Sequence, residues 1–153
     1  MAAIAQILRE EWAGEKDKEP FLAAAAAWRR PIPKGFLKGY LDLLFRHDGL
    51  YYVVDWKSNR LDGHADDFTE ERVREEMAEH HYFLQYLLYS AVLHRFLKET
   101  MGADYSWEKN FGGIRYVFLR GVAAGAEAAV FSDRPPARLL DRIGNALGLE
   151  DRT

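Results

Sequence analysis

The feature that most constrains this chain is the pair Asp48-Gly49, which stands between two apolar-rich runs in the segment Lys38 to Asn59. Glycine adopts the positive φ that a tight two-residue turn requires, so an Asp-Gly pair between alternating apolar residues predicts a β-hairpin. The sequence therefore predicts two antiparallel strands joined at this pair, with His47 opposite Leu50.

The same register places two carboxylates side by side. Counting back from the turn pairs Asp42 with Asp55, and alternation of side chains along a strand puts Lys57 on the same face. Like charges placed opposite each other destabilise a sheet unless something compensates them, and a divalent cation would do so. Oxygen ligands of this kind suit Mg²⁺ or Mn²⁺. We interpret the face as a nuclease site, where water activated by the cation attacks a phosphodiester and Lys57 orients that water or neutralises the developing charge.

The two faces of the hairpin have different predicted roles. The face opposite the carboxylates is wholly apolar and is predicted to be core; it carries Leu41, Leu43, Phe45, Tyr52, Val54 and Trp56. A simpler interpretation of the carboxylate face stays open. Asp42 and Asp55 are equally compatible with solvated positions on an open sheet face, with Lys57 in a surface ion pair that contributes little.

The rest of the chain predicts helices around this sheet. Alanine-rich and amphipathic segments predict helices over 2–13 and 20–28, and Thr69 predicts the N-cap of a helix that runs to about Lys98. A third strand is expected over 114–119, a loop over 123–129, a short strand at 130–131, and a last helix that Gly148 caps.

The motif order resembles that of a known family. The PD-(D/E)XK nuclease superfamily has a pattern of an Asp, then a hairpin, then Asp-x-Lys, which this chain resembles. The flanking sequence resembles the C-terminal nuclease domain of RecB-like proteins. The matching segments, which cover roughly Leu37 to the last helix, are KGYLDLLFRHDGLYYVVDWKSNRL, HHYFLQYLLYSAVLHRFL and NFGGIRYVFLRGV. The resemblance implies an α/β, restriction-endonuclease-like core, in which helices flank a small mixed β-sheet with the Asp-Gly hairpin.

The resemblance also implies an activity and a site. It implies a Mg²⁺-dependent deoxyribonuclease like exodeoxyribonuclease V, exonucleolytic and acting in double-strand break repair and recombination or in DNA degradation. It implies metal ligation by Asp42, Asp55 and the backbone carbonyl of Trp56, with Mn²⁺ as a possible substitute. Gln85 and Tyr89 fit the family's Gln-x-x-x-Tyr motif, although from the residues alone such a pair on a helix flank is more often structural.

Charge and composition limit the partners. The net charge of −3 and the pI near 6.0 mean that DNA contact needs a local basic patch. The candidates are Lys34, Lys38 and Arg60, with Arg29, Arg30 and Lys57 as further basic residues near the hairpin. No apolar run is long enough for a membrane span and no secretory leader is evident, so a cytoplasmic protein is expected. RecC-like and RecD-like subunits and RecA are partners implied by the resemblance only.

Some alternatives follow from the chain's length. We expect a single domain over 1–153, with a helical N-terminal segment (1–36), a catalytic core (37–122) and a C-terminal strand and helix (123–153). RecB-like nucleases carry a metal-binding His well upstream of the first Asp, whereas no His precedes His47 here. A catalytically silent DNA-binding or protein-docking module therefore stays open, as does a nuclease of the same fold with a structure-specific or restriction-type task.

Overall fold

The computed structural model describes residues 1–28, 38–61 and 67–149. The contacts divide the chain into two compact units, each built from separate stretches of sequence. The helical unit comprises Met1–Gly39, Ala78–Tyr105 and Pro135–Thr153, and the sheet unit comprises Tyr40–Met77 and Ser106–Arg134.

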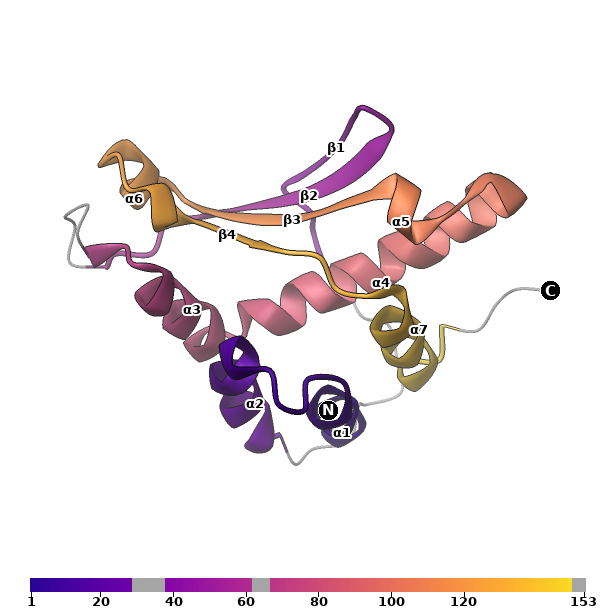
Figure 1. The fold of residues 1–153 in the computed structure, drawn as a ribbon, viewed down its shortest axis with the longest axis horizontal. Helices are drawn as coiled ribbons and strands as arrows, with labels where there is room; N and C mark the ends of the chain where they lie inside the picture. The colour runs from indigo at the N-terminus through magenta and orange to yellow at the C-terminus, as the bar shows by residue number, and fades with distance from the viewer. Residues whose placement is uncertain (29–37, 62–66, 150–153) are drawn as a thin grey trace. The chain divides into compact units, whose positions relative to one another are not determined.

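A four-stranded mixed sheet forms the centre of the sheet unit (Figure 1). Its strands are β1 (Leu43–His47), β2 (Leu50–Lys57), β3 (Phe111–Phe118) and β4 (Val130–Asp133), in the order β1-β2-β3-β4. β2 pairs antiparallel with β1 and parallel with β3, and β3 pairs antiparallel with β4. The predicted α/β class with a small mixed sheet is confirmed.

The hairpin between β1 and β2 has the predicted turn. Asp48 has φ +48° and Gly49 has φ +84°, the positive values that a two-residue turn of this kind requires at both central positions. His47 pairs with Leu50, as predicted, and the ladder extends back to Leu43 opposite Val54. The next pair in this register would be Asp42 and Asp55.

The burial of the two sheet faces differs from the prediction. Val53, Asp55 and Lys57 are buried, whereas Phe45 and Trp56 on the other face are 39% and 45% exposed. The expected core face is therefore largely open, with Leu41 and Leu43 also exposed and only Val54 fully buried.

The reason lies in the neighbouring strand β3. Its large apolar side chains Ile114, Tyr116 and Phe118 all share the carboxylate face and are completely buried. The other face of β3 carries Arg115 and Val117, which are only half-buried. β3 therefore makes the carboxylate face of β2 part of the core.

Short helices complete the sheet unit. They are α5 (Trp107–Asn110), α6 (Leu119–Ala123) and a 3-10 turn at Glu127–Ala129, so the loop expected over 123–129 contains a short helical turn. The helix α3 (Glu70–Glu79) begins in this unit, and the predicted cap is present because the Arg72 N–H donates to Thr69 Oγ1 at 3.2 Å.

The helical unit contains α1 (Ala2–Glu11), α2 (Glu19–Ala26), α4 (Tyr82–Met101) and α7 (Ala137–Ala146). Its core includes stacked aromatic rings, since Phe83 lies 5.0 Å from Phe21 and 5.4 Å from Trp28 between ring centroids. Arg142 of α7 donates to the carboxylates of Glu10 and Glu11, which ties α7 to α1.

The single helix predicted from Thr69 to about Lys98 is wrong, because the structure contains two helices. His81 has φ +54°, a left-handed conformation that interrupts the helical hydrogen-bond ladder. Its N–H bonds to Ala78 at i−3, and α4 starts at the next residue. The last helix is confirmed, and Gly148 follows it with φ +71°. Within the described ranges, no helix is both long and apolar enough to cross a bilayer.

Candidate active site

Asp55 and Lys57 form a buried ion pair at the end of β2. They are two residues apart on one strand and therefore point to the same face, where both are at most 9% exposed. The Lys57 ammonium lies 2.5 Å from Asp55 Oδ2. Burial raises the pKa of Asp55, the Lys57 ammonium opposes this shift, and the negative charge of Asp42 adds to it. The carboxylate thus depends on a neighbouring cation to stay ionised.

Tyr116 supports the Lys57 side chain from the next strand. Its ring is completely buried, and the ammonium lies 4.9 Å from the ring centroid, within the range of a cation–π contact. The register sets Tyr116 opposite Asp55 across the parallel β2–β3 pair. The sequence reasoning missed this residue. Alternation within β3 assigns it a face, but nothing local in the sequence states which residue of β2 it meets.

Asp42 lies at the same end of the hairpin, directly before β1, and is exposed. Its Oδ2 accepts a hydrogen bond from the Trp56 N–H at 2.9 Å. The N–H and C=O of one strand residue point to the same edge, so the Trp56 carbonyl also projects toward the edge where Asp42 lies. This edge is beyond the last β1–β2 pair, Leu43 with Val54.

The carboxylates of Asp42 and Asp55 and the Trp56 carbonyl have the ligand chemistry that a hard divalent cation requires. Two carboxylates and one carbonyl are oxygen donors of the kind that Mg²⁺ and Mn²⁺ prefer, and Mg²⁺ usually retains several water ligands. In the part of the chain that the structure describes, no group of three or more His, Cys, Asp or Glu side chains is placed to hold a metal. A cation here would therefore rest on Asp42, Asp55 and the Trp56 carbonyl.

The segment that follows β2 is held by two side-chain contacts. Arg120 Nε donates to the Ser58 carbonyl at 3.1 Å, and Asn59 Nδ2 donates to Glu76 Oε1 at 2.6 Å. Neither contact was predicted, because both join residues that are distant in sequence. They fix the backbone directly after Lys57.

Gln85 and Tyr89 lie on α4 in the helical unit. Their spacing of four residues places them on one face, as predicted, and Gln85 Nε2 donates to Tyr89 Oη at 3.1 Å. Both side chains are half-buried. An amide and a phenol linked in this way offer further hydrogen-bonding capacity to a phosphate.

The predicted DNA-contacting residues differ in their surroundings. Lys38 and Arg60 are exposed, as a phosphate contact requires. Lys57 is buried against Asp55 and so is not a surface contact. Lys34 lies outside the described residues, as do Arg29 and Arg30.

Comparisons with known proteins give one consistent set of relatives. The chain is 44% identical over 122 residues to RecBCD enzyme subunit RecB of Escherichia coli, which covers 77% of the chain and 10% of the relative. It is 41% identical over 110 residues to the RecB subunit of Haemophilus influenzae, with 72% and 9% covered. The RecB subunit of Mycobacterium tuberculosis is 35% identical over 158 residues, with 96% and 14% covered.

The chain spans about a tenth of the length of these curated relatives. No family model matches the chain.

Proposed function

The chain belongs to the RecB family, as a segment homologous to about a tenth of its relatives, and from this premise we propose that it is a metal-dependent DNA nuclease. The reaction is hydrolysis of a phosphodiester, exonucleolytic on DNA ends, in the repair, recombination or degradation of DNA. The relatives' name supports a setting in a RecBCD-type enzyme.

The observation that carries the proposal is the buried pair of Asp55 and Lys57, with Asp42 at the same end of the hairpin. Burying an ion pair costs solvation energy that the mutual attraction only partly offsets, so such a pair is weak as a stabilising device. A shifted carboxyl pKa together with a specific charged partner is characteristic of functional sites.

Each residue has a defined part in the proposed reaction. Asp42, Asp55 and the Trp56 carbonyl would hold Mg²⁺ or Mn²⁺, which would supply positive charge to the scissile phosphate and promote ionisation of the attacking water. Lys57 orients that water or neutralises charge on the phosphate. We include Gln85 and Tyr89 as hydrogen-bond donors to DNA phosphate, and Lys34, Lys38 and Arg60 as contacts to the DNA backbone.

The partners are proposed on the same premise. DNA is the substrate, and RecC-like and RecD-like subunits and RecA are the proteins with which a RecB-type chain would act. The net charge of −3 agrees with DNA affinity that comes partly from other subunits.

The test is digestion of linear and circular DNA, single- and double-stranded, with Mg²⁺, Mn²⁺ or a chelator. Asp55→Asn removes one charge at nearly constant volume. Asp48→Asn is the matched control, because Asp48 is an exposed carboxylate on the same hairpin and Asn tolerates its positive φ. We expect metal-dependent loss of linear DNA by the native chain and by Asp48→Asn, and at least a hundredfold slower loss by Asp55→Asn.

Cleavage of circular DNA would show that the chain is an endonuclease that uses the same chemistry, and not an exonuclease. Equal activity of Asp55→Asn and the native chain would refute the site.

A second candidate function has one observation in its favour. Among the described residues, no group of three or more His, Cys, Asp or Glu side chains could hold a metal, so Asp42 and Asp55 have no third ligand of these types. A catalytically silent module that binds DNA or docks on a partner is compatible with this. DNA binding without cleavage in either metal would favour this function.

A further inference from the structure

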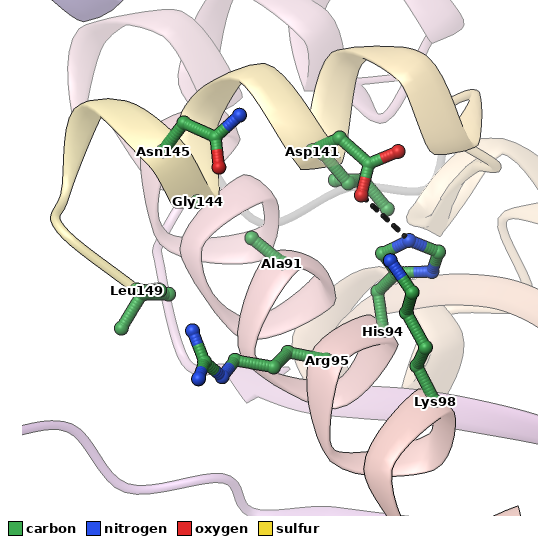
Figure 2. Close-up of a pocket in the computed structure, with 9 residues that line it drawn as sticks. Ala91, His94, Arg95, Lys98, Asp141, Gly144, Asn145 and Leu149 are labelled. Atoms are coloured by element: carbon green, nitrogen blue, oxygen red, sulfur yellow. Dashed lines mark hydrogen bonds and ion pairs between the residues drawn. The ribbon is translucent and has the colours of Figure 1, made fainter. Parts of the chain in front are cut away.

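A cavity of about 310 Å³ lies between α4 and α7 in the helical unit (Figure 2). Its volume is at the lower end of the range for small-molecule sites. Polar and charged residues line it from α4 (His94, Arg95 and Lys98) and from α7 (Asp141 and Asn145). All of them belong to the helical unit, and none is among the candidate residues of the active site.

The α4 wall of the cavity is basic. Arg95 and Lys98 are three residues apart on this helix and so lie on neighbouring turns of one face. Arg95 Nε donates to Glu99 at 2.7 Å, but its Nη1 is buried and has no hydrogen-bond partner among the residues that the structure describes. A buried donor without a partner is uncommon in native proteins, and a bound ion or water is a frequent explanation.

The α7 wall carries a carboxylate and an amide, from Asp141 and Asn145. Asp141 Oδ1 lies 3.1 Å from His94 Nε2, and His94 Nδ1 lies 2.5 Å from Tyr105 Oη. The two ring nitrogens of His94 thus join Asp141 to Tyr105. The Asn145 amide on the same wall offers both a donor and an acceptor to a ligand.

We propose that this cavity binds a phosphate dianion, either free or as the terminal phosphate of a small molecule such as a nucleoside monophosphate. A guanidinium matches phosphate geometry with paired hydrogen bonds, and an anion would give Arg95 the acceptor that the described residues do not provide. A phosphomonoester carries a charge of about −1.5 to −2 at neutral pH, so its attraction to a guanidinium is stronger than that of a carboxylate. The remaining volume, lined by Asn145 and Leu149, accommodates the group that carries the phosphate.

The test is calorimetric titration of the full chain in a phosphate-free buffer with chelator, so that nuclease activity plays no part. The probes are deoxyadenosine 5′-monophosphate, inorganic phosphate and deoxyadenosine. We expect deoxyadenosine 5′-monophosphate to bind, with or without binding of inorganic phosphate. Deoxyadenosine should not bind. Equal affinities for the two phosphates identify the free ion as a sufficient ligand, and tighter binding of the nucleotide identifies the esterified form.

Three variants assign the binding to this cavity. Arg95→Gln should weaken phosphate binding about tenfold or more, because a charged hydrogen bond is lost. Gly144→Leu should block the cavity while leaving every charged group in place, since a β-carbon at Gly144 meets only Leu149, at 3.9 Å. Arg72→Gln is the control, because Arg72 forms a similar intrahelical pair with Glu75 on α3, outside the cavity.

Circular dichroism and thermal melting of each variant verify that it is folded. The proposal is overturned if neither phosphate binds the native chain, or if binding persists unchanged in both Arg95→Gln and Gly144→Leu.

Discussion

At the scale of single residues, the site depends on a charge held where solvent does not reach. Asp55 is 3% exposed, and its carboxylate is compensated by the Lys57 ammonium at 2.5 Å. Removing one member of a buried pair leaves the other charge uncompensated, which costs more than the pair itself contributes. Both side chains should therefore affect stability as well as activity.

The first residue-scale prediction concerns pH. The pKa of Asp55 in the folded protein is above its ordinary value of 3.8, so between these two values the native state binds a proton that the unfolded chain does not bind. The contribution of Asp55 to the free energy of unfolding therefore rises as the pH falls through the folded pKa, and is lost as the pH rises. Urea unfolding of the native chain and of Asp55→Asn between pH 7.5 and pH 4.5 measures it. As the pH falls, the free energy of unfolding of the native chain should increase relative to that of Asp55→Asn. A difference between the two that does not change with pH would contradict the raised pKa.

The second residue-scale prediction concerns Lys57. Lys57→Met leaves Asp55 buried without its cation and should lower the free energy of unfolding by about 3 kcal/mol at pH 7.5. The exposed Lys109 of α5 is the control, and Lys109→Met should stay within about 0.5 kcal/mol of the native chain. The double variant Lys57→Met/Asp55→Asn should lose less than the sum of the two single variants. Strict additivity would show that the pair is not coupled.

At the scale of elements, close packing around α6 limits what can replace a single glycine. A β-carbon at Gly121 would lie 2.6 Å from the Ala129 β-carbon and 2.6 Å from Phe68 Cδ1, and both neighbours are buried. The backbone of α6 at Gly121 therefore lies close to the turn before β4 and to the residues that lead into α3.

We therefore predict that Gly121→Ala lowers the free energy of unfolding by about 1–3 kcal/mol, the usual cost of overpacking a core. Gly144→Ala in α7 is the matched control, because its β-carbon meets only an ordinary contact at 3.9 Å. The control should be neutral or stabilise by up to about 1 kcal/mol, since alanine restricts the unfolded chain. Equal denaturation midpoints for the two variants would contradict the tight packing at Gly121.

At the scale of the whole molecule, net charge and local charge have opposite consequences for DNA. A net charge of −3 repels the phosphate backbone, so the proposed DNA binding would depend on a few local cations. Of the proposed contacts, Lys38 and Arg60 are exposed. The expected DNA affinity of the chain alone is therefore modest and steeply dependent on salt.

The corresponding prediction is that Lys38→Gln and Arg60→Gln each reduce the slope of log affinity against log salt concentration by roughly 1. Lys16→Gln is the control, because Lys16 is an exposed lysine of the helical unit that is not among the proposed contacts. Fluorescence anisotropy of a labelled oligonucleotide with chelator measures the slopes. Unchanged slopes in both variants would remove these two residues from the DNA-binding surface.

The sequence by itself determined the features that depend on near neighbours. The Asp48-Gly49 turn fixed the hairpin and its register, which runs from His47 opposite Leu50 to Leu43 opposite Val54. Both follow from the backbone preferences of two residues and from the alternation of side chains along a strand. The spacing of Gln85 and Tyr89 likewise placed these side chains within hydrogen-bonding distance on one helix face.

Tertiary structure decided the rest, because burial depends on residues that are distant in the chain. β3 made the carboxylate face the buried one, although the opposite face of the hairpin is the more apolar in sequence. It also placed the Tyr116 ring beside Lys57. The break at His81 and the cavity between α4 and α7 arose in the same way. Local patterns set the conformation of each segment, whereas only the packed molecule sets which surfaces lose contact with water.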